Sequence, residues 1–517
     1  MEQNFVYDEH KNIVSTTQGK VRGYQYRGMH IFKGIPYAEA RRFHKPEPVK
    51  PWDHVLDATN YGYVCPLMSI DKPAGELKVP HRYWPMNENC QNLNIWTPGL
   101  DGEKRPVLVW LHGGGFFAGS SIEQIAYEGE NMCLAGDVVV VSINHRLNIL
   151  GYTDLSDFGM EYENSGNAGG DDIIAALSWI HDNILNFGGD PENVTVFGQS
   201  GGGVKVTTLL QSPEADGLIA RGIIMSGVIR SILEDSKGSG KELVDAIMER
   251  LGKKDVHELE TIPYEQLAAA YREISPAIQK AGGYIGGTPH PSDQYLGDPL
   301  KTDFRKETAN IPLLIGTVTG EFAGFFPGKY DKNAMNDETQ ELIIRKELGD
   351  NNADVLIPLF RKAYPERKLL DLLSVDFIFR APTIEYIRKR SALNASTYAY
   401  LFNLDQPVDG GTIPWHCSDI PFVFHNTQLV PSTQNPGVTE RLEKQIFDSV
   451  IAFARTGDPS NSSVPHWNNS TPQREYTMVF GENTELRENY DHELIVELEK
   501  RMGPYYQKIM SDIQIQH

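Results

Sequence analysis

A serine set among glycines is the first place in this chain where residue types and spacing point to chemistry. Ser200 lies at the centre of the small-residue segment 198–202, directly after the apolar run 194–197 and before the largely apolar segment 204–210. Because glycines let a backbone crowd closely around one residue, this context predicts a tight strand-to-helix turn that presents the Ser200 hydroxyl at the end of a sheet. Ser200 is therefore the candidate nucleophile.

A serine hydroxyl is a weak nucleophile, so it needs a base, an acid that orients the base, and N–H donors for the negative charge that develops on oxygen. The donors are found in the segment 112–116, which contains three consecutive glycines after the apolar run 106–111 and is called the oxyanion loop below. No side chain shields the backbone N–H groups there. The predicted donors are Gly114, Gly115 and the residue after the serine, Gly201.

The base is harder to choose, because the chain has fifteen histidines. For a nucleophile on a strand-to-helix turn, the chain order is serine, then Asp or Glu, then histidine. The candidates downstream of the serine are His257, His290, His416, His425, His466, His492 and His517. Among these, His416 stands out because it lies in a loop leading into the apolar, aromatic stretch 420–424.

The acid must lie between the serine and the base. Glu321 follows the short apolar run 311–316, which reads as a buried strand, and a carboxylate just past a strand end is well placed to hold an imidazole in the required tautomer. Asp405 and Asp409 also precede His416, and spacing does not exclude them. From the residues alone, the choice of acid stays open.

The elements that must position these residues read as an α/β architecture with a mostly parallel sheet. The strand-like runs are residues 107–111, 138–143, 194–197, 222–225, 313–316 and 398–401. They alternate with helical segments, of which residues 171–186 are the clearest, while charged helical stretches at about 236–274 and 336–390 interrupt the pattern. Because the candidate residues are spread along the chain and must converge, we predict one domain over 1–517 with these two stretches as excursions around the site.

Seven motifs, in the right order, resemble the type-B carboxylesterase family, which includes cholinesterases and bacterial para-nitrobenzyl esterases. They are residues 34–38, 89–98, 112–116, 166–169, 186–191, 316–321 and 416–424. The resemblance covers nearly the whole chain and implies the α/β-hydrolase fold, with a large mostly parallel central sheet flanked by helices. It also implies a carboxylic-ester hydrolase whose catalytic triad is Ser200, Glu321 and His416.

The resemblance further implies a small-molecule ester as substrate and chemistry that needs no metal and no cofactor. In such a mechanism an acyl-enzyme forms on the serine and is then cleaved by water. The same machinery acting on amides, carbamates or thioesters is the main alternative. A non-catalytic, cholinesterase-like binding protein is a second alternative, although such proteins typically lose a member of the triad.

Aromatic residues close to the motifs are candidate substrate contacts: Trp84, Phe116, Phe117, Phe325 and Phe326. Gln199, directly before the serine, is a further candidate substrate contact. The chain departs from the family pattern here, because Gln199 replaces the usual Glu and Gly201 replaces the usual Ala. Gln199 removes a negative charge, so we expect less attraction for cationic, choline-like esters. His425 stands where the family often has Gly.

The composition limits the partners. A net charge of −21 predicts no binding of nucleic acid, which needs clustered Lys and Arg. No basic region followed by an apolar core begins the chain, and no apolar run approaches the ~18 residues of a membrane span, so we expect a soluble, cytoplasmic protein, or a secreted one if a leader has been removed. The oligomeric state is not predicted.

The four cysteines are too few for a disulfide scaffold. Cys65 and Cys90 fall where secreted members of the family carry a disulfide, and the sequence does not decide whether they are paired. Cys417 lies beside His416, but no second ligand cluster with zinc spacing accompanies it. We therefore expect Cys417 to be a small residue with its bonding satisfied, rather than a metal ligand or a thiol nucleophile, and we predict no metal site.

Overall fold

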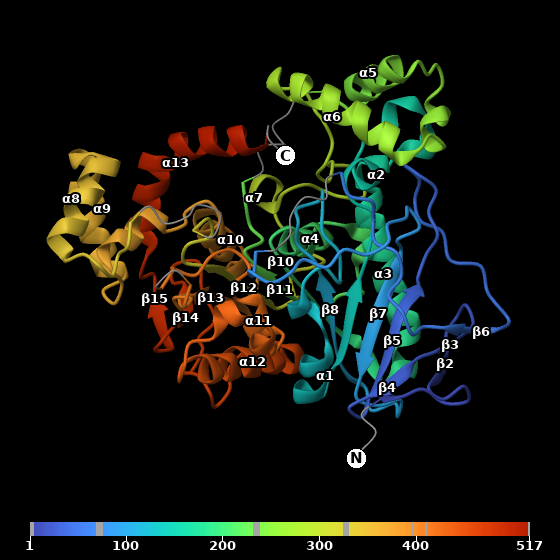
Figure 1. The fold of residues 1–517 in the computed structure, drawn as a ribbon, viewed down its shortest axis with the longest axis horizontal. Coiled ribbons are helices and arrows are strands. Elements are labelled where there is room, and N and C mark those ends of the chain that lie inside the picture. Colours follow the sequence, from blue (N-terminus) through green and yellow to red (C-terminus); the bar gives the residue numbers. More distant parts are fainter. Residues whose placement is uncertain are drawn as a thin grey trace. The chain divides into compact units, whose positions relative to one another are not determined.

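The computed structural model describes residues 5–68, 76–230, 238–323, 330–394, 396–408 and 411–514, with side chains described as far as residue 503. The chain divides into two compact units. Figure 1 labels their helices and strands. Unit 1 comprises Met1–Pro73, His81–Ile223 and Ser231–Ile311, and unit 2 comprises Ala74–Pro80, Ile224–Arg230 and Pro312–His517. No described helix is long and apolar enough to cross a membrane.

Unit 1 contains most of the strands. They are β1 (Phe5–Val6), β2 (Ile13–Ser15), β3 (Lys20–Arg22), β4 (Tyr24–Tyr26), β5 (Met29–Pro36), β6 (Val55–Asp57), β7 (Asn92–Thr97), β8 (Arg105–Leu111), β9 (Val139–Ile143) and β10 (Gly189–Gln199), followed by β11 (Arg221–Met225), which continues into unit 2. The main sheet has the order β1-β4-β5-β7-β9-β8-β10-β11, and β2, β3 and β6 form a small second sheet.

The strands at the centre of this sheet are buried along most of their length. β9 is apolar at four of its five positions and buried throughout, as expected for a strand covered on both faces. β8 pairs in parallel with both β9 and β10, whereas β1, β4, β5 and β7 pair antiparallel with their neighbours in this sheet. In the β8–β10 register Gly198 lies opposite Leu111. The segments that follow β8 and β10 therefore leave the sheet at the same edge.

The helices of unit 1 include a long one on the path to the serine and a short one directly after it. They are η1 (Ile125–Tyr127), α1 (Glu130–Gly136), α2 (Asn148–Gly151), η2 (Ser156–Phe158), η3 (Met160–Tyr162), η4 (Ser165–Asn167), α3 (Ala168–Asn183), η5 (Ile184–Phe187), α4 (Gly201–Leu210), η6 (Pro213–Ala215), α5 (Lys241–Leu251), η8 (Val256–Glu260), α6 (Tyr264–Lys280) and α7 (Pro299–Thr302). α3 and α4 both pack on β10, and α4 also contacts β8.

Unit 2 carries the remaining strands and helices. They are β12 (Leu313–Val318), α8 (Asp337–Leu348), α9 (Asp350–Ala363), η9 (Leu369–Ser374), α10 (Arg380–Ser391), β13 (Thr397–Phe402), α11 (Ile420–Val423), η10 (Thr427–Leu429), η11 (Pro431–Thr433), α12 (Thr439–Thr456), β14 (Tyr476–Phe480), β15 (Glu485–Glu488) and α13 (His492–Gln514). β12, β13 and β14 pair in parallel, β15 closes the edge antiparallel, and α10 packs on β12 and β13.

All six strands expected from the sequence are present, and the helix expected at 171–186 corresponds to α3 and η5. The charged stretches at about 236–274 and 336–390 contain helices α5 and α6 and helices α8 to α10 respectively. Their role around the site, and the single domain over 1–517, stay predictions. Strands β1 to β7, β14 and β15 were not anticipated, because strand formation depends on the neighbouring strands and on burial, which the local sequence does not contain.

Candidate active site

Ser200 occupies a strained turn between β10 and α4. Its backbone has φ 57° and ψ −126°, outside the usual regions for a residue with a side chain. Such a conformation costs on the order of 1–3 kcal/mol and persists only where the surroundings enforce it. The strand ends at Gln199 and the helix begins at Gly201, so the serine side chain is presented at the sheet edge.

Close backbone packing explains the glycines around this turn. A Cβ on Gly202 would lie 1.9 Å from the carbonyl oxygen of Leu111, and a Cβ on Gly198 would lie 2.4 Å from the carbonyl carbon of Gly202. Because β8 and β10 are adjacent and in register, the start of α4 presses directly against the end of β8. Side chains at these glycines would force the turn open.

The oxyanion loop passes beside the serine. A Cβ on Gly113 would lie 3.5 Å from the Cβ of Ser200, and a Cβ on Gly201 would lie 2.5 Å from the backbone nitrogen of Gly115. Gly114 and Gly115 have φ of 82° and 62°, which glycine adopts without strain. Gly114 is exposed. The three predicted N–H donors therefore belong to backbone segments that touch one another within unit 1.

The carbonyl groups of this loop are turned away into hydrogen bonds. The Gly113 carbonyl accepts from His112 Nδ1 at 2.9 Å, and the Gly114 carbonyl accepts from the N–H of Ala118 at 3.0 Å. Within the part of the chain that the structure describes, no group accepts a hydrogen bond from the N–H of Gly114, Gly115 or Gly201. Three N–H groups are thus available to bind an anionic oxygen.

Gly201 matters here for a second reason. A Cβ at this position would lie 2.3 Å from the carbonyl oxygen of Gly115, so the alanine usual in the family does not fit this arrangement. The backbone N–H at 201 is unaffected by the change of side chain. Glycine instead lets the oxyanion loop approach α4 more closely.

In unit 2, Glu321 and His416 form a direct pair. Glu321 Oε2 lies 2.6 Å from His416 Nδ1, and the backbone N–H of His416 donates to the carbonyl of Glu321 at 2.9 Å. Since an ionised carboxylate only accepts, Nδ1 carries the proton and Nε2 keeps its lone pair. This is the tautomer in which the imidazole can act as a base.

The second oxygen of Glu321 is held as firmly as the first. Oε1 accepts from the hydroxyl of Ser226 at 2.6 Å and from the backbone N–H of Val318 at 2.9 Å. Glu321 has no exposed surface. Ser226 directly follows β11 and donates its own N–H to the carbonyl of Gly316 in β12 at 2.7 Å, so strand packing fixes both the acid and its partner.

The environment of His416 favours the protonated ring. Burial by itself lowers the pKa of His416, but the hydrogen bond to Glu321 and the charge of its carboxylate outweigh burial, and the pKa is raised above the usual 6.5. Two further buried carboxyls feel the same charge. The pKa of Asp376 and that of Asp419 are each raised to about 7, first by burial and then by Glu321.

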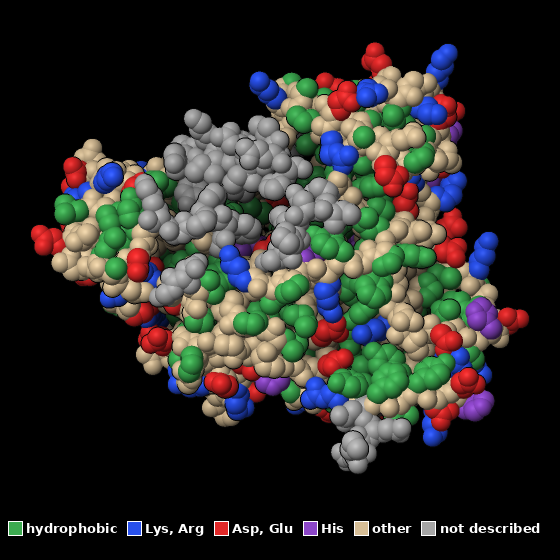
Figure 2. Space-filling model, viewed as in Figure 1, with side chains coloured by type: hydrophobic (Ala, Val, Ile, Leu, Met, Phe, Trp, Pro, Cys, Tyr) green, Lys and Arg blue, Asp and Glu red, His purple; other side chains and the backbone are tan. Residues whose placement is uncertain are grey.

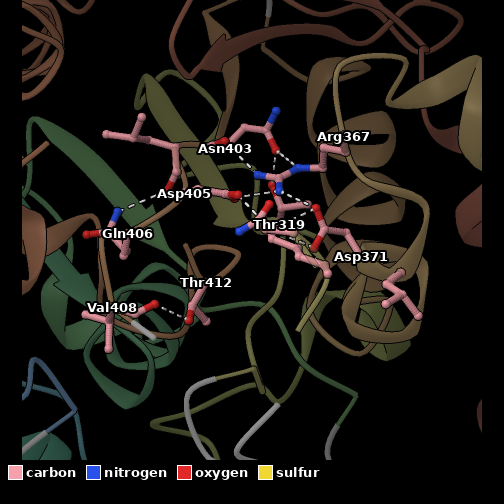
Figure 3. A network of polar contacts seen from close by, with 12 residues as sticks. Thr319, Arg367, Asp371, Asn403, Asp405, Gln406, Val408 and Thr412 are labelled. Carbon is pink, nitrogen blue, oxygen red and sulfur yellow. Dashed lines mark hydrogen bonds and ion pairs between the residues drawn. The ribbon is translucent and has the colours of Figure 1, made fainter. Parts of the chain in front are cut away.

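Of the two alternative acids, Asp405 and Asp409, the structure describes only Asp405. Asp405 belongs to a charged network, in which it accepts from Arg367 and Lys332 at 2.7 Å each (Figure 3). Arg367 also contacts Asp371 and Asn403. Asp405 is therefore engaged with cations rather than with an imidazole. Asp409 lies outside the described residues.

The other candidate bases have partners of their own or lie at the surface. His257 Nδ1 lies 2.6 Å from the hydroxyl of Tyr162, and His492 lies 3.4 Å from Glu475. His466 is exposed, the ring of His290 packs against Tyr284, and His517 lies outside the described residues.

His425 stacks on Phe447 with the ring centroids 4.8 Å apart and lies 3.4 Å from Glu443. Its φ of 60° is a glycine-like value. This conformation accounts for the glycine that the family often has at this position, because a residue without a side chain adopts it at no steric cost.

The expected substrate contacts differ in exposure. Phe116 is buried against Tyr152, and Gln199, the residue before the serine, is also buried. Phe117 is partly exposed beside Gly115, and Trp84 is 39% exposed. Phe325 and Phe326 lie outside the described residues.

All four cysteines are buried, and none of them, Cys65 and Cys90 included, forms a disulfide. Within the described residues, no cluster of three or more histidine, cysteine or carboxylate side chains has the geometry of a metal site.

Three polar side chains near the candidate catalytic residues were not predicted from the sequence. They are Ser226 and Asp376, which act on Glu321, and Lys205, which binds the carbonyl of His112 in the oxyanion loop. Ser226 had a weak signal, since it directly follows a predicted buried strand. Lys205 had a clearer one, because it is the single charge in the apolar segment of α4. Asp376 had none, since it reaches Glu321 through tertiary packing.

The chain matches the model of the carboxylesterase family over residues 10–495. It is 33% identical to para-nitrobenzyl esterase of Bacillus subtilis over 466 residues, which cover 87% of this chain and 91% of that protein. It is also 30% identical to phenmedipham hydrolase of Pseudarthrobacter oxydans, over 88% of this chain and 92% of the relative.

Solved structures that are similar to this chain are also esterases. An esterase from Clostridium hathewayi, described as able to hydrolyse aliphatic aromatic polyesters, is 50% identical with a TM-score of 0.93, over 96% of this chain and 99% of the other. A thermophilic para-nitrobenzyl esterase is 30% identical with a TM-score of 0.77, over 94% and 99%. The large, mostly parallel central sheet flanked by helices is that of the α/β-hydrolase fold. The chain belongs to the carboxylesterase family and is a carboxylic-ester hydrolase.

Proposed function

We propose that this carboxylesterase works through Ser200, Glu321 and His416 and passes through an acyl-enzyme. The observation that carries the proposal is the strained turn at Ser200, with the free N–H groups of the oxyanion loop beside it in unit 1. The direct pairing of Glu321 with His416 in unit 2 adds support. Because the mechanism uses residues of both units, the prediction of one catalytic domain over 1–517 is part of this proposal.

In the first half-reaction the Ser200 oxygen attacks the ester carbonyl carbon while His416 Nε2 takes the serine proton. The carbonyl oxygen becomes negatively charged and is bound by the N–H groups of Gly114, Gly115 and Gly201. The resulting imidazolium is stabilised by Glu321, in agreement with the raised pKa of His416. Collapse of the intermediate expels the alcohol, which receives the proton from His416.

In the second half-reaction water attacks the acyl group on Ser200. His416 takes a proton from that water and returns it to the serine oxygen as the carboxylic acid leaves. Every proton moves between His416 and the reacting oxygens. The chain's own groups thus supply the full reaction, and amides, carbamates and thioesters remain alternative substrates of the same machinery.

Aliphatic aromatic polyesters are a second candidate substrate class. The 50% identical esterase of Clostridium hathewayi is described as hydrolysing them. In this chain, Tyr63, Tyr83 and Trp84 are 50%, 44% and 39% exposed on two segments that are hydrogen-bonded to each other through Val64 and Pro85. Exposed rings of this kind adsorb to an aromatic polymer because both surfaces are apolar.

The test compares wild type, Ser200→Ala and Ser178→Ala on a short para-nitrophenyl ester in EDTA, and on an aliphatic aromatic polyester film. We expect Ser200→Ala to lose at least ~10⁴-fold in kcat on the soluble ester and to release no aromatic acid from the film. Ser178 lies on α3 with its hydroxyl bonded to the carbonyl of Ile174, so it is a matched control that keeps full activity.

Labelling by a fluorophosphonate probe gives an independent readout, because the probe bonds only to an activated serine. Wild type and Ser178→Ala are expected to be labelled and Ser200→Ala is not. Equal hydrolysis by wild type and Ser200→Ala would remove the serine from the mechanism. Full ester hydrolysis by wild type without release from the film would reject only the polyester candidate.

A further inference from the structure

Lys205 is a buried lysine close to the proposed oxyanion hole. It lies in the second turn of α4, five residues after Ser200, and is 1% exposed. Lysine is rarely buried without a reason, because removing an ammonium from water costs several kcal/mol. Its Nζ donates a hydrogen bond of 2.9 Å to the backbone carbonyl of His112, the first residue of the oxyanion loop.

We propose that Lys205 is a positioning residue for the oxyanion hole, which fixes the oxyanion loop by holding the His112 carbonyl. The inference rests on the proposed function, since it assigns how the N–H groups named there are aimed. Each carbonyl at the start of the loop has a partner of its own. Lys205 Nζ donates to the carbonyl of His112, and the His112 ring donates to the carbonyl of Gly113. The N–H of Ala118 donates to the carbonyl of Gly114.

Peptide planarity turns these carbonyl contacts into a constraint on the N–H groups. The C=O of one residue and the N–H of the next lie in one plane and point in opposite directions. Fixing the carbonyls of Gly113 and Gly114 therefore aims the N–H groups of Gly114 and Gly115. The Lys205 contact anchors the plane before them, so that the whole segment cannot rotate as a unit.

Among the described residues no carboxylate forms an ion pair with Lys205, and the His112 carbonyl is its hydrogen-bond partner. The pKa of Lys205 is lowered to about 7, chiefly by burial, with Glu123 opposing the shift. Both the ammonium and the neutral amine carry N–H donors, so the bond to His112 does not depend on the charge. The stacked rings of His112 and His145 have pKa values well below 6.5 because of burial and then of Lys205, so both rings are neutral.

The backbone of α4 makes this reach possible. A Cβ on Gly202 would lie 3.0 Å from the His112 carbonyl oxygen, so α4 starts directly against the loop. From the next turn of the helix, a long side chain returns to the same carbonyl. A short side chain at position 205 would leave that carbonyl buried and without its donor.

The experiment compares wild type, Lys205→Met and Val206→Ala. Methionine is apolar and nearly as long as lysine, so it keeps the packing while removing the donor. For Lys205→Met we expect kcat on a short para-nitrophenyl ester to fall about 10- to 100-fold, less than the ~10²–10³-fold loss of a whole donor. The KM is expected to stay within about twofold, because the loop acts on the transition state.

A trifluoromethyl ketone gives a readout that a purely structural role does not move. Ser200 adds to its carbonyl carbon and leaves a negatively charged oxygen in the oxyanion hole, which mimics the transition state. Its affinity is expected to fall in Lys205→Met by the same factor as kcat. Val206, a fully buried neighbour in α4, is the control: Val206→Ala lowers the melting temperature but leaves kcat and ketone affinity within about twofold.

Three results would overturn the proposal: unchanged kcat and ketone affinity in Lys205→Met, a rise of KM that accounts for the whole loss, or an equal loss of kcat in Val206→Ala. Failure here is distinct from failure of the proposed function. If Ser200→Ala is inactive while Lys205→Met is normal, only the role of Lys205 is rejected. If Ser200→Ala keeps its activity, the mechanism itself is rejected.

Discussion

The Glu321 carboxylate has a hydrogen-bond donor on each oxygen and one further donor from the backbone. A carboxylate held in this way cannot rotate, so it fixes both the position and the tautomer of the His416 ring. Because Glu321 has no exposed surface, solvent screens the charge of its carboxylate only weakly, and that charge acts strongly on the His416 ring. Burial lowers the pKa of His416, and Glu321 is the neighbour that raises it most, ahead of the charges of Glu76 and Asp419.

The pH dependence of ester hydrolysis is expected to report this neighbour. The base must be neutral, so kcat/KM rises with pH and levels off above the pKa of His416, which lies above 6.5. In Glu321→Gln the charge is gone and burial dominates, so the midpoint moves to lower pH while the plateau falls by ~10²–10⁴-fold. A pH-rate profile from pH 5 to 9 measures both quantities, and an unchanged midpoint would contradict the role of Glu321.

At the scale of elements, a charged network joins the end of β13 to η9 and to the turn before Glu321 (Figure 3). Arg367, with a side chain that is 4% exposed, donates to Asn403 and Asp405 at 2.7 Å and to Asp371 at 3.1 Å. Thr319 donates its hydroxyl to the same Asn403 oxygen. The network therefore ties the loop after β12 to the loop after β13.

Removing Arg367 is expected to destabilise this part of unit 2. Arg367→Met leaves Asp371 and Asp405 with Lys332 as their shared cation, and breaking a buried ionic network costs about 3–5 kcal/mol. We expect calorimetry to show a melting temperature lowered by several degrees. Lys362→Met, which removes an exposed pair with Glu493, is the control and shifts it little. Equal shifts in the two variants would contradict a structural role for the network.

At the scale of the whole molecule, the net charge of −21 makes additional buried negative charge unfavourable. On the face shown in Figure 2, acidic and basic side chains of the described residues are interspersed. Asp419 is one of several acids that are buried instead. It is 1% exposed, Tyr400 donates to its Oδ2 at 2.8 Å, and among the described residues nothing donates to Oδ1.

Asp419 is expected to make stability fall as pH rises. Its pKa is raised from 3.8 to about 7, so the folded protein binds this proton more tightly than the unfolded chain. Stability from this group is complete below about pH 4 and is lost as the pH rises to about 7. Asp419→Asn cannot ionise, so we expect its melting temperature to exceed that of wild type at pH 8 and to match it near pH 4. At pH 8 the free energy of unfolding of Asp419→Asn is expected to exceed that of wild type by at most about 4 kcal/mol.

Melting curves of both proteins at several pH values measure this difference. If the difference in melting temperature between Asp419→Asn and wild type is the same at every pH, the carboxyl is ionised throughout, or the difference comes from packing alone. A gap that closes as the pH falls supports the buried, proton-binding carboxyl. The measurement does not depend on catalytic activity.

The local features of this protein follow from its sequence alone. Glycines at 113–115 and 201–202 permit close backbone approach, and apolar runs form buried strands, because both effects depend on residues that are neighbours in the chain. The resemblance of seven motifs then indicated the family, which the comparisons confirmed. Spacing alone did not choose between Glu321, Asp405 and Asp409.

Only the tertiary structure brought distant residues into contact. Glu321 and His416 are 95 residues apart in the chain, as are Ser226 and Glu321, and they meet because β11, β12 and β13 run side by side and their loops leave at one edge. The bond from Lys205 to His112 likewise depends on α4 packing against the end of β8. Strand register and helix packing are sums over many weak contacts, and no short stretch of sequence contains them.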